Sequence, residues 1–203
     1  MGELQKDEQA LARHQFFDAV ATSWKNELSA NDLHFLRFVL NRCSTPPEIG
    51  KKTLDIGCGT GILFPFLNEL EIVALDYSQE MLNEAKKLHS SNVIEYVCAD
   101  AQSLPFPDGT FARAIMSGVF PHFDNPEQAL REAYRVLGYG GLLTIIHLQD
   151  IETINQIHRQ TGGAVADDLL PSAEGIQDLV MKAGFTTEFI ETKNRFALIG
   201  RKV

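Results

Sequence analysis

The residues best suited to chemistry form a glycine-rich turn, Asp55-Ile56-Gly57-Cys58-Gly59-Thr60-Gly61, which closes a short apolar run. Glycine lets the backbone turn tightly and approach a ligand without a Cβ in the way. A glycine turn that directly follows a buried parallel strand is typical of a ligand crevice at the carboxyl end of that strand. The pattern therefore predicts a ligand site at residues 55–61, with a plain tight turn as the alternative.

A second carboxylate, Asp76, ends the next apolar run. A carboxylate at that place can accept hydrogen bonds from both hydroxyls of a ribose. The dinucleotide fingerprint G-x-G-x-x-G/A needs a small third residue where this chain has Ile62, which argues against a nicotinamide site. No G-K-[ST] is present, which argues against a P-loop. Asp76 could instead be an ordinary acid at the start of the following helix.

Three histidines are candidates for proton transfer, because imidazole titrates near neutral pH. His122 and His147 each come near a predicted strand end, and His158 lies on the helix that follows. With Asp167 or Asp168 nearby, the same residues could bind a divalent metal, but no H-x-x-x-H or comparable pairing supports this, and we predict no metal site. The alternative is three unrelated polar residues.

Alternating strands and helices must position these groups. Apolar runs and turn residues predict strands over 53–56, 72–75, 93–99, 111–117, 142–148, 185–190 and 195–202. Helical spacing and caps predict helices over 61–69, where Pro65 near the start could limit the helix, and over 78–88, 125–137, 151–159 and 172–183. This order predicts a mostly parallel sheet with helices on both faces.

The N-terminal part is expected to be separate from this body. Residues 11–41 have amphipathic helical spacing, with Phe16, Val20 and Trp24 on one stripe, until Pro46-Pro47 breaks the pattern. We therefore predict a helical extension over 1–45 and the main domain over 46–203. The aromatic stripe could form a lid over the site or simply pack against the body.

Composition limits the partners and the location. Lys and Arg number 18 against 27 Asp and Glu, for a net charge of −9, so a phosphate backbone or an anionic membrane would be repelled. The 3 cysteines form no C-x-x-C pair and are expected to be reduced thiols. A signal-like start and a membrane-length apolar run are absent, so we expect a cytoplasmic protein without stable membrane insertion.

Four segments in order, LDIGCGTG, ALDYSQEML, CADAQSLPFPDGTFARAI and ALREAYRVLGYGGLLTI, resemble the class I S-adenosylmethionine-dependent methyltransferases. The resemblance is to the small-molecule subgroup that contains the ubiquinone/menaquinone C-methyltransferases. It covers residues 50–148, with a family-like tail to 203. It implies an α/β fold, a single Rossmann-like three-layer domain whose mostly parallel seven-stranded sheet has a reversed edge strand.

The resemblance also implies a cofactor, S-adenosyl-L-methionine, with S-adenosyl-L-homocysteine as the product. Its methionine and sulfonium would lie against Asp55 and the turn residues Gly57, Cys58, Gly59 and Gly61. Asp76 would hold the ribose diol, with Tyr77 and Met81 beside it, and Ser117 would face the methyl donor toward the substrate. Asp100 would accept from the adenine amino group, beside Ala101 and Gln102. Met81 could equally be a helix core residue, and Cys58 a small packing residue.

The implied reaction is in-line methyl transfer to O, C or N of a small-molecule acceptor. Because the sulfonium is already activated, the protein mainly aligns the acceptor and excludes water. A base helps only where the acceptor must lose a proton, and His147, His122 and His158 are the candidates. The alternatives are a non-catalytic S-adenosylmethionine-binding sensor or scaffold and, with less support, a nicotinamide-dependent oxidoreductase. We expect a monomer or homodimer that binds no nucleic acid.

Overall fold

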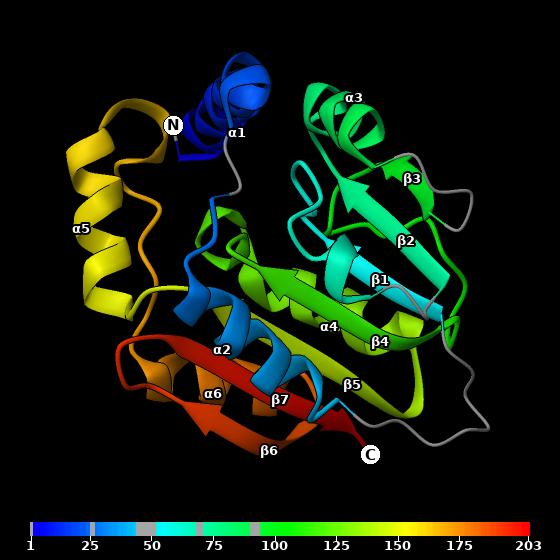
Figure 1. Cartoon of the computed structure of the whole chain (residues 1–203). Coiled ribbons are helices and arrows are strands. Elements are labelled where there is room, and N and C mark those ends of the chain that lie inside the picture. Colours follow the sequence, from blue (N-terminus) through cyan, green and yellow to red (C-terminus); the bar gives the residue numbers. More distant parts are fainter. Residues whose placement is uncertain (1, 25–26, 44–51, 68–70, 90–93) are drawn as a thin grey trace.

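The computed structural model describes residues 2–24, 27–43, 52–67, 71–89 and 94–203. Seven strands form one sheet in the order β3-β2-β1-β4-β5-β7-β6 (Figure 1). They are β1 (Lys52–Ile56), β2 (Glu71–Asp76), β3 (Ile94–Cys98), β4 (Phe111–Ser117), β5 (Leu137–His147), β6 (Phe185–Glu191) and β7 (Phe196–Lys202). Strands β1 to β5 pair in parallel, whereas β7 runs antiparallel to both neighbours. The predicted sheet is confirmed, and the reversed strand β7 lies next to the edge strand β6.

Helices cover both faces of this sheet, which makes three layers. On one face α4 (Pro126–Val136) and α6 (Ala173–Lys182) pack on Leu54 and Ile56 of β1. On the other face α2 (Ala30–Leu40) and α3 (Gln79–Leu88) pack on Ile72 and Ala74 of β2. Central parallel strands are buried on both sides, which explains their continuous apolar sequences.

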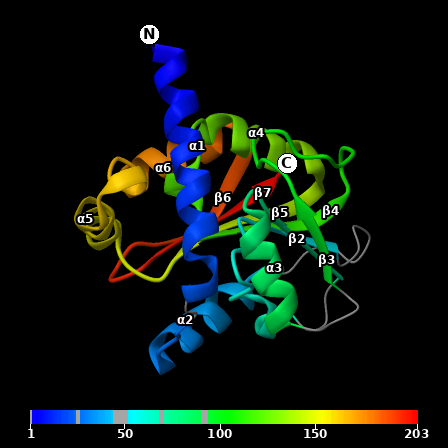
Figure 2. The ribbon, with the colours of Figure 1, turned by 90° about the horizontal axis from the view of Figure 1, so that it is seen from above.

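The remaining helices lie at the carboxyl ends of the parallel strands. Helix α1 (Gly2–Val20) runs between α3 and α5 (Ile151–Thr161) when the molecule is viewed from above (Figure 2). The strand order reverses between β1 and β4, and open α/β sheets bind ligands in the crevice at such a switch point. Helix α1 therefore lies over the expected ligand site. Among the described residues, no helix is both long and apolar enough to span a bilayer.

Three element predictions are wrong in detail. The helix expected over 61–69 is only a 3₁₀ turn, Phe64–Phe66, because Pro65 lacks an amide proton and sits inside the segment. The helix expected over 11–41 is two helices, because Ser29 and Asp32 form a capping box that starts α2 anew. Trp24 therefore does not continue the helical stripe. The Pro46-Pro47 break and the boundary between 45 and 46 lie outside the described residues.

The third difference concerns the glycines after α4. The predicted helix ends at 137 and the predicted strand begins at 142, but β5 already begins at Leu137. The register against β4 shifts between Phe111 and Arg113, and Gly140 has a φ of +79° in this stretch. Lys202 Nζ donates to the carbonyls of Tyr134 and Leu137, which ties the end of α4 to β7.

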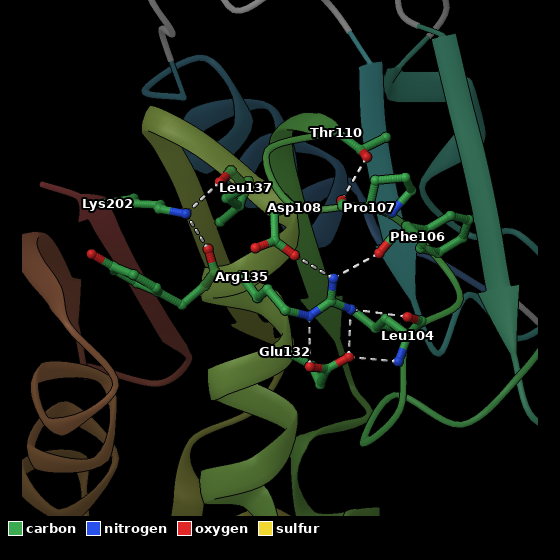
Figure 3. A network of polar contacts seen from close by, with 10 residues as sticks. Leu104, Phe106, Pro107, Asp108, Thr110, Glu132, Arg135, Leu137 and Lys202 are labelled. Atoms are coloured by element: carbon green, nitrogen blue, oxygen red, sulfur yellow. Dashed lines mark hydrogen bonds and ion pairs between the residues drawn. The ribbon is translucent and has the colours of Figure 1, made fainter.

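Among the side chains of α4 that hold the loop between β3 and β4 is Arg135 (Figure 3). Its guanidinium donates to the carbonyls of Leu104 (3.0 Å) and Phe106 (2.7 Å) and to both oxygens of Glu132 (2.7 and 2.8 Å). Glu132 also accepts from the Leu104 amide at 2.8 Å. This loop carries residues 100–102, so the network fixes one wall of the crevice.

Replacing Arg135 by alanine should lower the free energy of unfolding by about 1–2 kcal/mol, because two loop carbonyls and Glu132 lose a charged donor at a partly exposed site. Urea unfolding measures this change. Arg131→Ala on the same helix is the control, since Arg131 is exposed and its polar partners in the described part of the chain, Gln128 and Glu127, lie on the same helix. Its effect should stay within about 0.5 kcal/mol. Equal effects of the two variants would show that the loop anchor contributes nothing.

Candidate active site

The glycine turn after β1 has the backbone form that only glycine adopts readily. Gly57 and Gly59 have φ values of +68° and +52°. The amides of Gly57 and Cys58 both donate to the Leu75 carbonyl, at 2.7 and 3.0 Å, which ties the turn to the end of β2. A Cβ on Gly57 would lie 2.3 Å from Val119 Cγ2, whereas a Cβ on Gly59 would meet no atom within 4 Å. The turn is therefore packed against Val119 at Gly57 and open at Gly59.

Gly57→Ala should destabilise the fold by about 2–4 kcal/mol, from the strained φ together with the clash against Val119. Gly109→Ala is the matched control, because Gly109 has the same φ of +68° and its nearest neighbour would be 3.9 Å away. The control should lower the free energy of unfolding by about 1–2 kcal/mol, because the strained φ is its one source of destabilisation. Equal unfolding midpoints in urea for the two variants would contradict the packing argument.

Two buried carboxylates lie beside the turn. Asp76 accepts from the Gly59 amide at 2.8 Å and from the Ser78 amide at 2.9 Å, and burial raises its pKa although these bonds oppose the shift. Asp55 is 1% exposed, and neither of its oxygens has a hydrogen-bond partner within the described part of the chain. Burial, and then the charge of Asp76, raise the pKa of Asp55 to about 7. An acid left unpaired inside a protein is typical of a functional site.

The raised pKa of Asp55 gives stability a defined pH dependence. Between pH 4 and pH 7 the folded state keeps a proton that the unfolded state releases, so stability falls as the pH rises, by up to about 4 kcal/mol. Asp55→Asn removes this group. The stability of the variant relative to wild type should therefore increase with pH across that range, as measured by urea unfolding at each pH. Parallel curves for the two proteins would contradict the assignment.

Two cavities open at this end of the sheet and meet. Cavity 1, of about 280 Å³, lies under α1 and against residues 99–102 and 122–124. Cavity 2, of about 320 Å³, lies between the glycine turn, the end of β4, the end of β5 and α5. The two share Gly57, Tyr77, Val119 and His122, so they are adjacent parts of one crevice.

Most of the predicted site residues line this crevice. Those on cavity 2 are Gly57, Cys58, Gly59, Asp76, Tyr77, Met81, Ser117, His122, His147 and His158. Those on cavity 1 are Gly57, Tyr77, Asp100, Ala101, Gln102 and His122. Asp55 and Gly61 line neither cavity: Asp55 is buried in β1, and Gly61 faces Phe64 and His89.

The walls of cavity 2 combine apolar and imidazole groups. Phe17 and Trp24 approach from the N-terminal segment, and Ile154 and Ile157 from α5. The rings of His122 and His158 are 5.0 Å apart, and Phe17 lies edge-on to His122 at 4.9 Å. Burial lowers the pKa of His147 to about 3, and its Nε2 has no hydrogen-bond partner among the described residues. His147 is therefore neutral at pH 7.

The sequence predicts Asp168 near the histidines but does not predict its ion pair with Arg13 behind His122. Arg13 of α1 lines cavity 1 and bonds to Asp168, which comes from the segment after α5. An arginine in a polar helix and an aspartate in a loop carry no sequence signal for this pairing. Within the described ranges, no group of three or more histidine, cysteine, aspartate or glutamate side chains could hold a metal ion.

The chain is similar in sequence to known methyltransferases. A family model described as a methyltransferase domain matches residues 54–145. The chain is 27% identical, over 217 residues, to the ubiquinone/menaquinone biosynthesis C-methyltransferase UbiE of Vibrio cholerae, covering 90% of this chain and 83% of the relative. It is 33% identical over 123 residues to a chloroplastic 2-methyl-6-phytyl-1,4-hydroquinone methyltransferase 1 of Oryza sativa, covering 57% of this chain but 37% of the relative.

The fold also resembles a solved structure. A SAM-dependent methyltransferase from Aquifex aeolicus superposes with a TM-score of 0.67 at 22% identity, covering 83% of this chain and 89% of that one. At this identity the likeness concerns the fold.

Proposed function

Because the chain belongs to the class I S-adenosylmethionine-dependent methyltransferases, we propose that its crevice binds S-adenosylmethionine across cavities 1 and 2 and presents the methyl group to a small acceptor. The observation that carries this proposal is the junction of the two cavities between the glycine turn and Tyr77. An elongated ligand with an adenosine end and a methionine end fits such a crevice. Asp76 lies on it and can accept from a ribose diol.

The chemistry of the lining residues fits this cofactor. A carboxylate oxygen can accept more than one hydrogen bond, so Asp76 retains capacity for the ribose beyond its two backbone amides. The Tyr77 hydroxyl is buried without a hydrogen-bond partner in the described part of the chain. Gly59 is open toward cavity 2, which lets the backbone approach the cofactor.

The remaining contacts are assigned by the same logic. We assign the adenine to Asp100, Ala101 and Gln102 on cavity 1, and the methionine end to Gly57, Cys58, Gly59, Met81 and Ser117 on cavity 2. Asp55 and Gly61 are assigned to the support of the turn, because they line neither cavity. Residues 1–45 are proposed as a lid and 46–203 as the methyltransferase domain.

The acceptor would occupy the apolar part of cavity 2. When bound, S-adenosylmethionine supplies an activated methyl group and leaves as S-adenosylhomocysteine. Phe17, Trp24, Ile154 and Ile157 would exclude water and hold an apolar ring. The relatives are named for the methylation of quinone precursors, which supports a quinol-type acceptor and transfer to carbon.

His122 is the proposed base for an acceptor that must lose a proton. It lines both cavities, and burial lowers its pKa, so the ring is neutral and able to accept at pH 7. His147, with a pKa of about 3, is a weak base and is assigned to orienting the acceptor. The cytoplasmic location, the monomer or homodimer and the lack of nucleic-acid binding stay predictions.

The test is incubation of the purified protein with methyl-labelled S-adenosylmethionine and a reduced demethylated naphthoquinone. Label should appear in the quinone product. A parallel incubation with a cell extract reports other small acceptors. Protein that binds the donor by calorimetry but yields labelled product from neither source would contradict methyl transfer and support a sensor.

A further inference from the structure

Asp168 is the centre of a buried polar cluster that joins three distant parts of the chain. It is 3% exposed. Its Oδ2 lies 2.7 Å from His122 Nδ1 and 2.8 Å from Arg13 Nε, and its Oδ1 accepts from Arg13 Nη2 at 2.7 Å. One carboxylate thus bonds at the same time to a histidine on the crevice and to an arginine of helix α1.

The partners of Asp168 determine where His122 carries its proton. Burial alone would raise the pKa of Asp168, but the hydrogen bonds from His122 and Arg13 bring it below its ordinary value. An ionised carboxylate only accepts hydrogen bonds, so Nδ1 of His122 must be the protonated nitrogen. In the neutral ring Nε2 then holds the lone pair that can accept a proton.

His158 fixes the segment that carries Asp168. Its Nδ1 bonds to the backbone carbonyl of Asp168, which can only accept, so this nitrogen also bears the proton. The carbonyl is held from α5 while the carboxylate is held from α1. The orientation of the Asp168 side chain toward His122 is therefore fixed from two sides.

Arg13 supplies the positive charge that balances Asp168. It is 5% exposed, and Nη1 also bonds to Asp124 Oδ1 at 2.8 Å. Without Arg13 the charge of Asp168 would be balanced by His122 alone. The ring would then take up a second proton, on Nε2, more readily. An imidazole ring that carries protons on both nitrogens cannot act as a base toward the methyl acceptor.

We propose that Asp168 and Arg13 are positioning residues of the methyl-transfer reaction, which complete the base His122 only when helix α1 is docked on the crevice. This inference rests on the proposed function. Asp168 fixes the tautomer and direction of the ring, as a carboxylate does for the histidine of a catalytic triad. Arg13 lies on the helix that covers the cofactor site and balances the charge of Asp168. Docking of α1 would therefore cover the site and complete the base at the same time.

The neighbours of His122 set the expected direction of each change. The titratable and charged groups around it are Arg13 from α1, Tyr77 after β2, Asp124 from its own loop, His147 from β5, His158 from α5 and Asp168. Removing the negative group Asp168 should lower the pKa of His122. Removing the positive group Arg13 should raise it.

The experiment measures His122 in the full-length protein by ¹⁵N NMR of the imidazole, which needs neither donor nor acceptor. Wild type should show the proton on Nδ1. Asp168→Asn should lose this fixed tautomer and titrate at lower pH, whereas Arg13→Gln should titrate at higher pH. Arg13→Lys keeps the charge and should restore most of the wild-type titration. Arg195→Gln is the matched control: it breaks an Arg195–Asp32 pair of 2.6 Å elsewhere and should change nothing.

Kinetics give the second measurement. Asp168→Asn should reduce kcat by about 10²–10⁴ with little change in donor affinity, and Arg13→Gln should move the acid limb of the kcat profile to higher pH.

A proton on Nε2 in wild type, or shifts of the same sign in both variants, would overturn the inference. Donor binding by calorimetry is measured separately, so the proposed function can stand or fail independently. If circular dichroism shows that a variant is unfolded, the inference is still tested by the tautomer of His122 in wild type and by the titration of Arg13→Lys.

Discussion

Replacement of Asp76 by asparagine is expected to weaken S-adenosylmethionine binding by about 30- to 1000-fold. The ribose would lose two charge-assisted hydrogen bonds, a difference of about 2–4 kcal/mol. Asparagine keeps the shape of the side chain, but its amide group can present a donor to the Gly59 amide, where Asp76 presents an acceptor at 2.8 Å. Calorimetric titration with the donor measures the change.

The matched control for Asp76 is Asp18→Asn. Asp18 lies on α1, and its Oδ1 accepts from the Ser78 hydroxyl at 2.5 Å, but it lines neither cavity. Its replacement removes an equal charge near the site and should leave the donor affinity within about threefold. A similar loss in both variants would mean that net charge, and not a bond to the ribose, determines affinity. Unchanged affinity in Asp76→Asn would refute the ribose assignment.

Replacement of His122 by glutamine is expected to reduce kcat by about 10²–10⁴ while donor affinity stays nearly constant. The reason is that the proposed base is lost, whereas the residues assigned to the cofactor are intact. The acid limb of the kcat profile should disappear with the imidazole. Steady-state rates across a pH series, together with calorimetry, separate this loss from a loss of binding.

His147→Gln is the comparison variant for His122. Both histidines line cavity 2, but His147 has a pKa of about 3 and no hydrogen-bonded carboxylate in the described structure. Its replacement should cost about tenfold or less in kcat and preserve the acid limb. A large loss in His147→Gln with normal turnover in His122→Gln would reverse the two assignments.

These expectations agree with the charge distribution of the crevice. The glycine turn is flanked by Asp55 and Asp76, and the one arginine among the lining residues, Arg13, is already paired with two carboxylates. A site of this kind favours a ligand that carries positive charge and hydrogen-bond donors. The sulfonium, ammonium and ribose hydroxyls of S-adenosylmethionine supply these groups.

Much of this site followed from local sequence. Buried parallel strands need continuous apolar residues, and the tight turn after β1 needs glycine, so both are visible as patterns over a few residues. Asp76, His122 and His147 could be placed together because the carboxyl ends of parallel strands meet at one edge of a sheet. The sheet and most helices were therefore predictable within a few residues.

Other features depended on contacts between distant residues. No local pattern distinguishes Asp55 and Gly61, which line neither cavity, from Gly57 and Gly59, because exposure to a cavity depends on what packs above each residue. The two helices in place of one over 11–41 and the short turn at Pro65 have local causes instead, the capping box at Ser29 and the proline itself, which outweigh helical spacing. The sequence alone determined the strands, the turn and the acid that follows β2. Only the tertiary structure brought Arg13 against Asp168, because two charges leave water for each other only where the folded chain buries both.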